Sequence, residues 1–395
     1  MAWLGAVIYR FPSRHIKVVA VTGTKGKTSV VEITNAILRE AGYKTAVSNT
    51  IRFKIAGESR DNMHKMSMPG RFFMQKFLSD AVKAGCQYAV VEATSQGAQF
   101  FRHRFIDFDA LIFTNIAPEH IEAHGSFDKY LAAKLSIAEA VSRSPKKPTI
   151  IVANKDDKHH DRFVDHPFEH KVLFSLSDAA PFQLHKEGFY MTVRGMRIDS
   201  LLSGEFNIMN ELAAITYADT QGISIETCKK AIEKFTGIRG RVERIEAGQD
   251  FTVVVDYAHT PDSLQKLYDV FQNSRRICVL GNTGGGRDTW KRDQMARIAA
   301  AECDEIILTN EDPYDDDPKK IVDDMAAAIA DAVPQVIMDR REAIAKALAM
   351  AKSSDAVLIT GKGTDPYIMG ANNTKIPWDD ATVVREELAK LKQRG

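Results

Sequence analysis

The sequence has few cysteines, and those it has are scattered. Among 395 residues, Cys86, Cys228, Cys278 and Cys303 lie far apart and form no C-x-x-C pair. This spacing argues against a structural zinc site and against a disulfide framework. We therefore expect no disulfide, and a protein that works in a reducing compartment such as the cytoplasm.

The chain also lacks an excess of charge of either sign, since 53 basic residues nearly balance 52 acidic ones. No global field would steer it toward nucleic acid or a membrane surface, so we expect neither as a partner. No stretch approaches the roughly 20 apolar residues of a membrane span. The opening residues 1–9 are apolar but few and have no basic leader, so they do not look like a signal peptide.

What the sequence does contain is a phosphate-binding pattern near its start. The β-branched run 16–21 predicts a buried strand, which breaks at two glycines and leads into an apolar-periodic helix. Backbone N–H groups at such a turn point at a phosphate. Lys27 would meet the β- and γ-phosphates, and the Thr28 hydroxyl would hold Mg²⁺. The full G-x-x-x-x-G-K-[ST] pattern fails only at Val21, and an ordinary strand-to-helix turn is the alternative.

Two more strands are predicted to end beside this loop. The apolar runs 88–92 and 110–115 both give way to polar residues. Ligands of open α/β sheets gather at the carboxyl ends of strands. We therefore expect residues 22–28, 92–95 and 114–120 to form one site.

Glu92 and His120 lie at these strand ends, where a carboxylate and an imidazole would complete the Mg²⁺ shell begun by Thr28. Each also has a commoner structural role. A carboxylate at this place can cap a helix, and a histidine after a strand is more often structural than a ligand.

The remaining pattern predicts two domains, 1–238 and 239–395, divided at the glycine-rich residues 237–240. In the first, the polar residues 49–70 indicate a long loop or hairpin at a substrate edge, and residues 165–203 indicate a small antiparallel sheet. In the second, strands and helices alternate as in an α/β domain. The strands are expected at 251–256, 276–281, 304–309 and 355–360, and the helices at 261–272, 289–302, 318–332 and 340–352.

The order of these motifs resembles that of the Mur ligase family. The matching pieces read Thr22–Thr28, Glu92, Thr114–His120 and His124-Gly125, followed by Tyr130–Lys134, Gly204–Asn210, Gly240–Glu243, Asp256–Leu264, Gly281–Asp288, Lys291-Arg292 and Gly361–Gly363. The segment at 256–264 is the most specific. It is close to the hallmark of the UDP-N-acetylmuramoyl-dipeptide ligases, which add the third residue of the stem peptide.

The resemblance implies an ATP- and Mg²⁺-dependent ligase that forms an amide between a muramyl-peptide-like carboxylate and an amino acid. In the family, the γ-phosphate of ATP is transferred to the carboxylate, and an amine then displaces phosphate from the acyl phosphate. The implied fold is α/β: a P-loop-type central ATPase domain with a mainly parallel sheet, and a Rossmann-like C-terminal domain.

The resemblance also assigns residues to roles. The catalytic residues would be Lys27, Lys134, His259 and Lys362, with Lys134 carbamylated so that it can bind a second Mg²⁺. ATP would be bound by Gly23, Thr24, Lys25, Gly26, Lys27, Thr28, Ser29, Asn207, Asn210, Arg241 and Asp256. The metal ligands would be Thr28, Glu92, His120 and Lys134, and the substrate residues Asp312, Tyr314, Gly361 and Asp365.

The sequence departs from the family in three places. Family enzymes usually carry an N-terminal domain that binds the UDP end, but here the phosphate loop begins at residue 22. We therefore expect that domain to be missing, with a separate protein as a candidate to replace it. The G-K-G-H-E segment reads Gly361–Asp365, and the D-N-P-R segment reads Glu311–Tyr314. The second change removes the arginine that meets the far carboxylate in diaminopimelate-adding members.

The acidic run 311–317 bears on the choice of amino acid. A loop of carboxylates disfavours a substrate that ends in a carboxylate and favours one that ends in an ammonium. The sequence therefore favours lysine over meso-diaminopimelate. The alternative is a solvated acidic run, with Asp316 and Asp317 close to the N-terminus of a helix that begins at Pro318.

Other functions fit parts of the chain. Asn154–Asp157 matches the N-K-x-D guanine-reading motif, so a regulatory GTPase is the alternative from another class. Such a protein would have no role for residues 256–264 or 361–363. Among ligases, folylpolyglutamate synthase and the ligase half of cyanophycin synthetase share the phosphate loop, whereas the tyrosine–histidine segment 257–259 favours the muramyl type. A nucleotide-binding protein without ligase activity is a further alternative.

Overall fold

The computed structural model describes residues 1–119, 124–286, 289–330 and 332–394, which divide into two compact units, Met1–Thr236 and Gly237–Gly395. Both units are mixed α/β, as the sequence predicts. The predicted ligand His120 lies outside the described residues. In the part of the chain that the structure describes, no helix combines the length and apolar character needed to cross a membrane.

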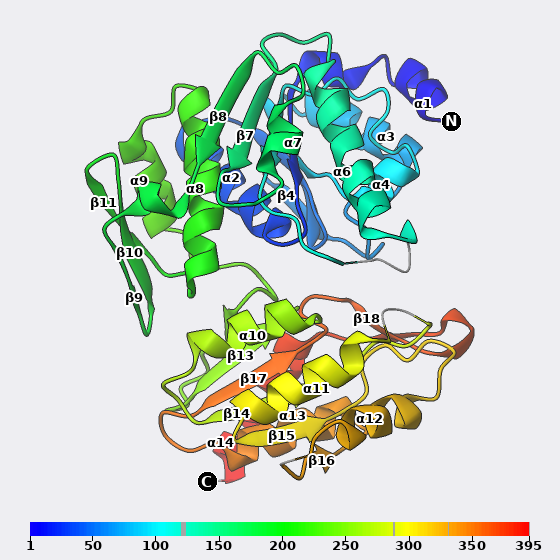
Figure 1. Cartoon of the computed structure of the whole chain (residues 1–395), viewed down its shortest axis with the longest axis vertical. Helices are drawn as coiled ribbons and strands as arrows, with labels where there is room; N and C mark the ends of the chain where they lie inside the picture. The colour runs from blue at the N-terminus through cyan, green and yellow to red at the C-terminus, as the bar shows by residue number, and fades with distance from the viewer. Residues whose placement is uncertain (120–123, 287–288, 331, 395) are drawn as a thin grey trace. The chain divides into compact units, whose positions relative to one another are not determined.

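The first unit is built on an eight-stranded sheet in the order β4-β3-β2-β5-β1-β6-β7-β8. Figure 1 shows the neighbouring strands β7 and β8 of this sheet. Six of its strands run parallel: β1 (Lys17–Thr22), β2 (Thr45–Ser48), β5 (Tyr88–Glu92), β6 (Ala110–Phe113), β7 (Ile150–Asn154) and β8 (His170–Phe174). The antiparallel hairpin of β3 (Arg52–Ile55) and β4 (Glu58–Asp61) forms one edge. The sequence prediction of a loop or hairpin at 49–70 is therefore confirmed.

Both faces of this sheet are buried, which explains the unbroken apolar run of β1. Val19 and Val21 face one core with α2 (Lys27–Glu40), α8 (Glu205–Thr220) and α9 (Ile225–Glu233). Val18 and Ala20 face the other core with α3 (Arg71–Lys83) and α6 (Phe127–Ser142). The shorter helices of the unit are α1 (Ala2–Ile8), α4 (Ser95–Gln99) and α7 (His160–Val164), with 3-10 turns at Pro12–His15 and Leu176–Ala179.

The prediction for residues 165–203 needs a correction. A small antiparallel sheet does form, from β9 (Phe182–His185), β10 (Gly188–Val193) and β11 (Met196–Ser200). The segment before it, however, becomes β8 and extends the main sheet parallel to β7. As an edge strand β8 is mostly exposed, so its sequence lacks the continuous apolar run of the central strands.

The second unit holds a six-stranded sheet in the order β12-β13-β17-β14-β15-β16, parallel except for β12. Its strands are β12 (Glu243–Arg244), β13 (Thr252–Asp256), β14 (Arg276–Leu280), β15 (Glu305–Leu308), β16 (Gln335–Val336) and β17 (Ala356–Thr360). One face packs on α10 (Pro261–Val270), α11 (Lys291–Glu302) and α12 (Pro318–Ala327), and the other on α13 (Arg340–Met350) and α14 (Asp380–Arg394). A 3-10 turn at Ala371–Asn373 connects the two strands of a small antiparallel sheet, β18 (Tyr367–Met369) and β19 (Lys375–Pro377).

The expectation of no disulfide is wrong. Cys278 in β14 and Cys303 after α11 form one, with Cα atoms 6.1 Å apart, whereas Cys86 and Cys228 are buried free thiols. The pairing depends on the crossover, because α11 returns the chain to β15, where Ile306 pairs with Cys278. A spacing of 25 residues in the sequence does not reveal this approach.

The Arg340–Asp380 ion pair provides a test of the second unit's core, since both side chains are almost fully buried and the two groups lie 2.7 Å apart. Arg340→Leu would leave the Asp380 carboxylate buried without its partner, which typically costs about 3–5 kcal/mol. The neighbouring Arg341 is the matched control, because its guanidinium is partly exposed and pairs with the exposed Glu386 and with Glu387, which Lys390 also contacts. Arg341→Leu should cost less than about 1 kcal/mol.

Urea unfolding followed by circular dichroism would measure both variants. Equal losses for Arg340→Leu and Arg341→Leu would show that the buried pair does not carry the stability assigned to it.

Candidate functional site

Three neighbouring strands of the first unit, in the order β5-β1-β6, end at the same edge of the sheet. The register pairs Val21 with Glu92 on one side and Thr22 with Phe113 on the other. The structure therefore brings together residues 22–28, 92–95 and the described part of 114–120. This is the clustering that the strand pattern predicts.

The loop between β1 and α2 has room only for glycine at two positions. Gly23 has a φ of +153°, and a Cβ there would lie 1.9 Å from the Thr114 hydroxyl oxygen. Gly26 is the N-cap of α2 with a φ of +81°, and a Cβ would lie 2.3 Å from Oδ1 of Asn210. The backbone is thus free of side chains where it meets the helix N-terminus, as a phosphate site requires.

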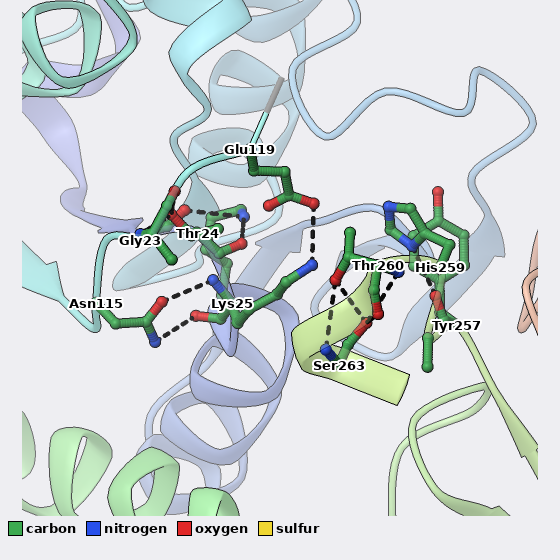
Figure 2. Close-up of polar contacts among 12 residues, drawn as sticks. Gly23, Thr24, Lys25, Asn115, Glu119, Tyr257, His259, Thr260 and Ser263 are labelled. Carbon is green, nitrogen blue, oxygen red and sulfur yellow. Dashed lines mark hydrogen bonds and ion pairs between the residues drawn. The ribbon is translucent and has the colours of Figure 1, made fainter. Parts of the chain in front are cut away.

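Residues 114–119 hold the loop in place, as Figure 2 shows for Asn115 and Glu119. The Lys25 N–H donates to Oδ1 of Asn115 at 2.9 Å, and Nδ2 of Asn115 donates to the Lys25 carbonyl at 3.2 Å. The Lys25 ammonium pairs with Glu119 at 2.9 Å. The Thr24 hydroxyl lies 2.8 Å from the Tyr130 hydroxyl. The loop is therefore braced on the side of β6 and α6.

Two lysines converge on the carbonyl oxygen of Gly23. Nζ of Lys27 donates to it at 3.0 Å and also to the Thr24 carbonyl at 2.9 Å, and Nζ of Lys134 donates to it at 2.6 Å. Lys134 extends from α6 and is almost fully buried. Burial and, next, the Lys27 ammonium lower the pKa of Lys134 well below its ordinary value, against the opposing effect of Glu119 and Glu92.

The Glu92 carboxylate is completely buried at the end of β5 and accepts from three hydroxyl groups. Oε1 accepts from Thr28, the second residue of α2. Oε2 accepts from Ser67 and, at 2.8 Å, from Thr50. The sequence reasoning identified Thr28 and Glu92 but missed Thr50 and Ser67, whose only signal was a polar segment without a motif.

The predicted ATP-binding residues Asn207 and Asn210 lie on α8, which packs against α2 in the same core. Nδ2 of Asn210 donates to Oδ1 of Asn207 at 2.8 Å, and Nδ2 of Asn207 donates to the Ser203 carbonyl at 2.9 Å. Ser29 is buried in the first turn of α2. Asn210 also limits the space at Gly26, so the structure brings this segment to the phosphate loop.

Two of the predicted metal ligands, Thr28 and Glu92, lie in contact. Oxygen ligands suit Mg²⁺, and Thr28 with Glu92 supplies them at one point. The ammonium of Lys134 instead donates a hydrogen bond to the Gly23 carbonyl oxygen. Within residues 1–119, 124–286, 289–330 and 332–394, no group of three or more His, Cys, Asp and Glu side chains is placed to hold a metal ion.

The guanine-reading alternative finds no support in the side chains of Asn154–Asp157. Nδ2 of Asn154 donates to the Thr114 carbonyl at 2.8 Å, and Asp157 accepts from the Ile116 N–H at 2.6 Å. Both side chains therefore brace the segment that follows β6 rather than pointing at a base.

In the second unit, Lys362 is a buried cation with several acceptors. Its ammonium lies 2.7 Å from Asp312, 2.6 Å from the Tyr367 carbonyl and 3.6 Å from Asp365. The preceding Gly361 has a φ of +101°, and a Cβ there would lie 2.3 Å from Oε2 of Glu311. The predicted substrate residues Asp312, Gly361 and Asp365 thus lie together around Lys362.

The segment after β13 is held by backbone contacts. Asp256 accepts from the N–H groups of Val242 and Ala258, each at 2.6 Å. The Arg241 guanidinium lies 4.4 Å from the centre of the Tyr257 ring. Nδ1 of His259 lies 2.7 Å from the Tyr257 carbonyl, as Figure 2 shows beside the Thr260–Ser263 cap of α10.

The contacts of the acidic run 311–317 support the alternative in which its carboxylates cap a helix and brace the backbone. Asp317 is the N-cap of α12 and accepts from the Lys319 N–H at 2.9 Å. Asp316 accepts from the Gly285 N–H at 3.1 Å, and Asp315 from the Asn372 N–H at 2.7 Å. Tyr314 has a φ of +52°, and its ring packs beside Gly285. Each of these carboxylates therefore has a structural role, although Asp315 and Asp317 stay exposed.

Comparisons with known proteins agree with the family resemblance of the sequence motifs. Family profiles described as "Mur ligase middle domain" and "Mur ligase, glutamate ligase domain" match residues 21–218 and 240–363. A UDP-N-acetylmuramyl-tripeptide synthetase of Roseiflexus is 37% identical, with 100% of this chain and 83% of that protein covered. A UDP-N-acetylmuramoyl-L-alanyl-D-glutamate–2,6-diaminopimelate ligase of Gloeobacter violaceus is 36% identical, with coverages of 100% and 81%.

A solved structure shares the fold alone. The folylpolyglutamate synthase of Mycobacterium tuberculosis, complexed with ADP and AMPPCP, superimposes with a TM-score of 0.73 at 16% identity, covering 92% of each chain.

Gly26 and Gly42 form a matched pair that tests the phosphate loop. Both flank α2 with similar left-handed φ values, +81° and +88°, but a Cβ at Gly42 would meet nothing within 4 Å. Gly26→Ala adds a clash with Asn210 to the backbone strain of about 1–2 kcal/mol that both variants share. We expect Gly26→Ala to weaken ATP binding at least tenfold, and Gly42→Ala to lose only stability.

Fluorescence titration with an ATP analogue would measure the binding, and thermal unfolding would measure the stability. Unchanged binding by a folded Gly26→Ala variant would argue against a nucleotide at this loop.

Proposed function

The chain belongs to the Mur ligase family of ATP-dependent acid–amino-acid ligases, and we propose that it joins an amino acid to a UDP-muramoyl-dipeptide. The names of its relatives support this acceptor, because the alignments with those relatives cover the whole chain. One structural observation carries the proposal: the Thr28–Glu92 pair lies directly behind the glycine loop at the N-terminus of α2. The folylpolyglutamate alternative has weaker support, because that likeness is one of fold alone.

We place the ATP phosphates on the loop 23–29, with the charge of Lys27 over them and adenine beside Asn207 and Asn210. The Thr28 hydroxyl donates a hydrogen bond to Glu92, so the lone pairs of its oxygen face away from the carboxylate. That oxygen could therefore serve as a ligand of Mg²⁺. Bound there, Mg²⁺ would neutralise charge on the phosphates. His120 and Lys134 stay proposed ligands of the family type.

We also propose roles for residues of the second unit. We assign Arg241 and Asp256 to the nucleotide and His259 and Lys362 to the reacting groups. The buried Lys362 supports this assignment, because Asp312 and Asp365 hold its ammonium in one place. We assign Asp312, Tyr314, Gly361 and Asp365 to the incoming amino acid.

The chemistry follows from the need for a leaving group. A carboxylate oxygen attacks the γ-phosphorus of ATP, the bond to ADP breaks, and an acyl phosphate forms. The amino group then attacks the acyl carbon, loses a proton, and inorganic phosphate leaves with its electron pair. Two anions meet in the first step, so the chain's task is to neutralise charge and align the reacting atoms.

The direct test offers the protein ATP, UDP-muramoyl-dipeptide and a panel of amino acids. We expect phosphate release together with a product heavier by one amino acid residue. Lys27→Ala should abolish turnover, because it removes the ammonium that we place over the phosphates, and the half-buried side chain makes unfolding of the variant unexpected. Turnover with GTP in place of ATP, without a ligated product, would favour the GTPase alternative. A cytoplasmic location stays a prediction of the sequence.

Carbamylation of Lys134 is the second part of the proposal. CO₂ reacts with a neutral amine, and burial favours that form by lowering the pKa of Lys134. We expect Lys134→Ala to be nearly inactive and to be partly rescued by added acetate, which replaces the missing carboxylate. In ¹³C-bicarbonate, the wild-type protein should show a carbamate signal by NMR that Lys134→Ala lacks. Full activity of Lys134→Ala would remove the lysine from the mechanism.

We predict the amino acid substrate from the segment Glu311–Asp317, where Tyr314 takes the place of an arginine. We keep lysine as the favoured substrate, although the relative from Gloeobacter violaceus is named for 2,6-diaminopimelate. Exposed Asp315 and Asp317 would attract an ammonium, and no arginine stands at position 314 for a second carboxylate. Tyr314→Arg should shift the ratio of kcat/KM values toward meso-diaminopimelate at least tenfold. A wild-type preference for meso-diaminopimelate would contradict the prediction.

A further inference from the structure

The buried Glu92 carboxylate connects the phosphate loop to the segment between β2 and α3. Besides Thr28, the hydroxyls that reach it are those of Thr50 and Ser67, which lie 17 residues apart in this segment. We infer that Thr50 and Ser67 are positioning residues, which hold one oxygen of Glu92 so that only the other faces the metal ion. This inference rests on the proposed Mg²⁺ role of Glu92.

The argument begins with the acceptor capacity of the carboxylate. An ionised carboxylate has two oxygens and about four lone-pair sites in all. Oε2 lies within hydrogen-bond distance of both the Thr50 and the Ser67 hydroxyls, so these two groups occupy the space around that oxygen. Oε1 accepts from Thr28 alone among the described residues, which leaves one site on that oxygen. Glu92 would therefore bind a metal ion through Oε1 only, next to the Thr28 hydroxyl oxygen.

The segment is braced so that its two hydroxyls arrive together. Nδ2 of the buried Asn62 donates to the Asn49 carbonyl at 2.7 Å and to the Met66 carbonyl at 3.0 Å. This one amide joins the residue before Thr50 to the residue before Ser67. The Ser48 hydroxyl, at the end of β2, donates to the Ser67 carbonyl at 3.1 Å. The Thr50 and Ser67 hydroxyl oxygens lie 2.7 Å apart as a result.

Outer groups of this kind tune a metal site without touching the metal. Hydrogen bonds to a ligating carboxylate fix its orientation, and their loss typically lowers metal affinity or activity about 10–100-fold. Without Thr50 and Ser67, the Glu92 side chain can rotate and offer either oxygen. The expected consequence is weaker binding of Mg²⁺ with nucleotide, with no change for nucleotide alone.

Calorimetry with ADP as the probe separates these quantities. The ratio of the Kd values in EDTA and in excess Mg²⁺ reports the contribution of the metal and needs no turnover. We expect this ratio to fall about tenfold in Thr50→Val and in Ser67→Ala, and further in the double variant. The Kd in EDTA should stay at the wild-type value. Thr50→Ser keeps the hydroxyl and should keep the ratio.

Thr45→Val is the matched control. Thr45 is a buried residue of β2, and its hydroxyl lies 2.7 Å from Oδ1 of Asn35, so the variant loses the same kind of buried hydrogen bond. It does not touch Glu92. We expect it to lose stability in thermal unfolding and to keep the wild-type Mg²⁺ ratio.

Glu92→Gln distinguishes failure of the inference from failure of the proposed site. If Glu92→Gln keeps the full Mg²⁺ ratio, the proposed metal role of Glu92 is wrong. If Glu92→Gln loses the ratio but the folded double variant keeps it, the site stands and the positioning role is refuted. Should the double variant fail to fold, Thr50→Val alone decides, because Thr50 is only half-buried.

Discussion

Burial of the Glu92 carboxylate is the constraint on which the first unit depends. A fully buried charge at the end of a central strand is tolerated only when its oxygens are hydrogen-bonded. The donors come from α2 and from both ends of the 49–70 segment, so these elements have to meet at one point. That convergence places the first turn of α2, and with it the phosphate loop, against the end of β5.

The loop itself depends on close approach of backbone to backbone. At Gly23 the chain passes so near Thr114 that no side chain fits, and the Gly23 carbonyl becomes the shared acceptor of Lys27 and Lys134. Two neighbouring amines repel each other when both are charged. Burial first, and then repulsion from the Lys27 ammonium, lowers the pKa of Lys134, the more deeply buried of the two. A lysine prepared in this way is suited to reaction with CO₂, whereas Lys27 keeps the position expected of a phosphate-binding cation.

Much of this arrangement can be predicted from the sequence, because it depends on patterns that local residues carry. The apolar runs of β1, β5 and β6, each followed by polar residues, are enough to predict strands whose ends share one edge, and the motif order identified the Mur ligase family. Thr50 and Ser67 could not be predicted, since their role arises from Asn62 joining two turns of an unremarkable polar segment. The same holds for the Cys278–Cys303 disulfide and for β8, which depend on how strands pair across long separations.

The central claim is that this chain activates a carboxylate by transferring phosphate to it at the loop formed by Gly23 and Gly26. Labelling the acceptor carboxylate with ¹⁸O tests the claim directly, because the acyl-phosphate route moves one carboxylate oxygen into inorganic phosphate. After ligation, mass spectrometry of the phosphate should show one ¹⁸O atom for each amide formed. Unlabelled phosphate, or label found in AMP, would contradict the account.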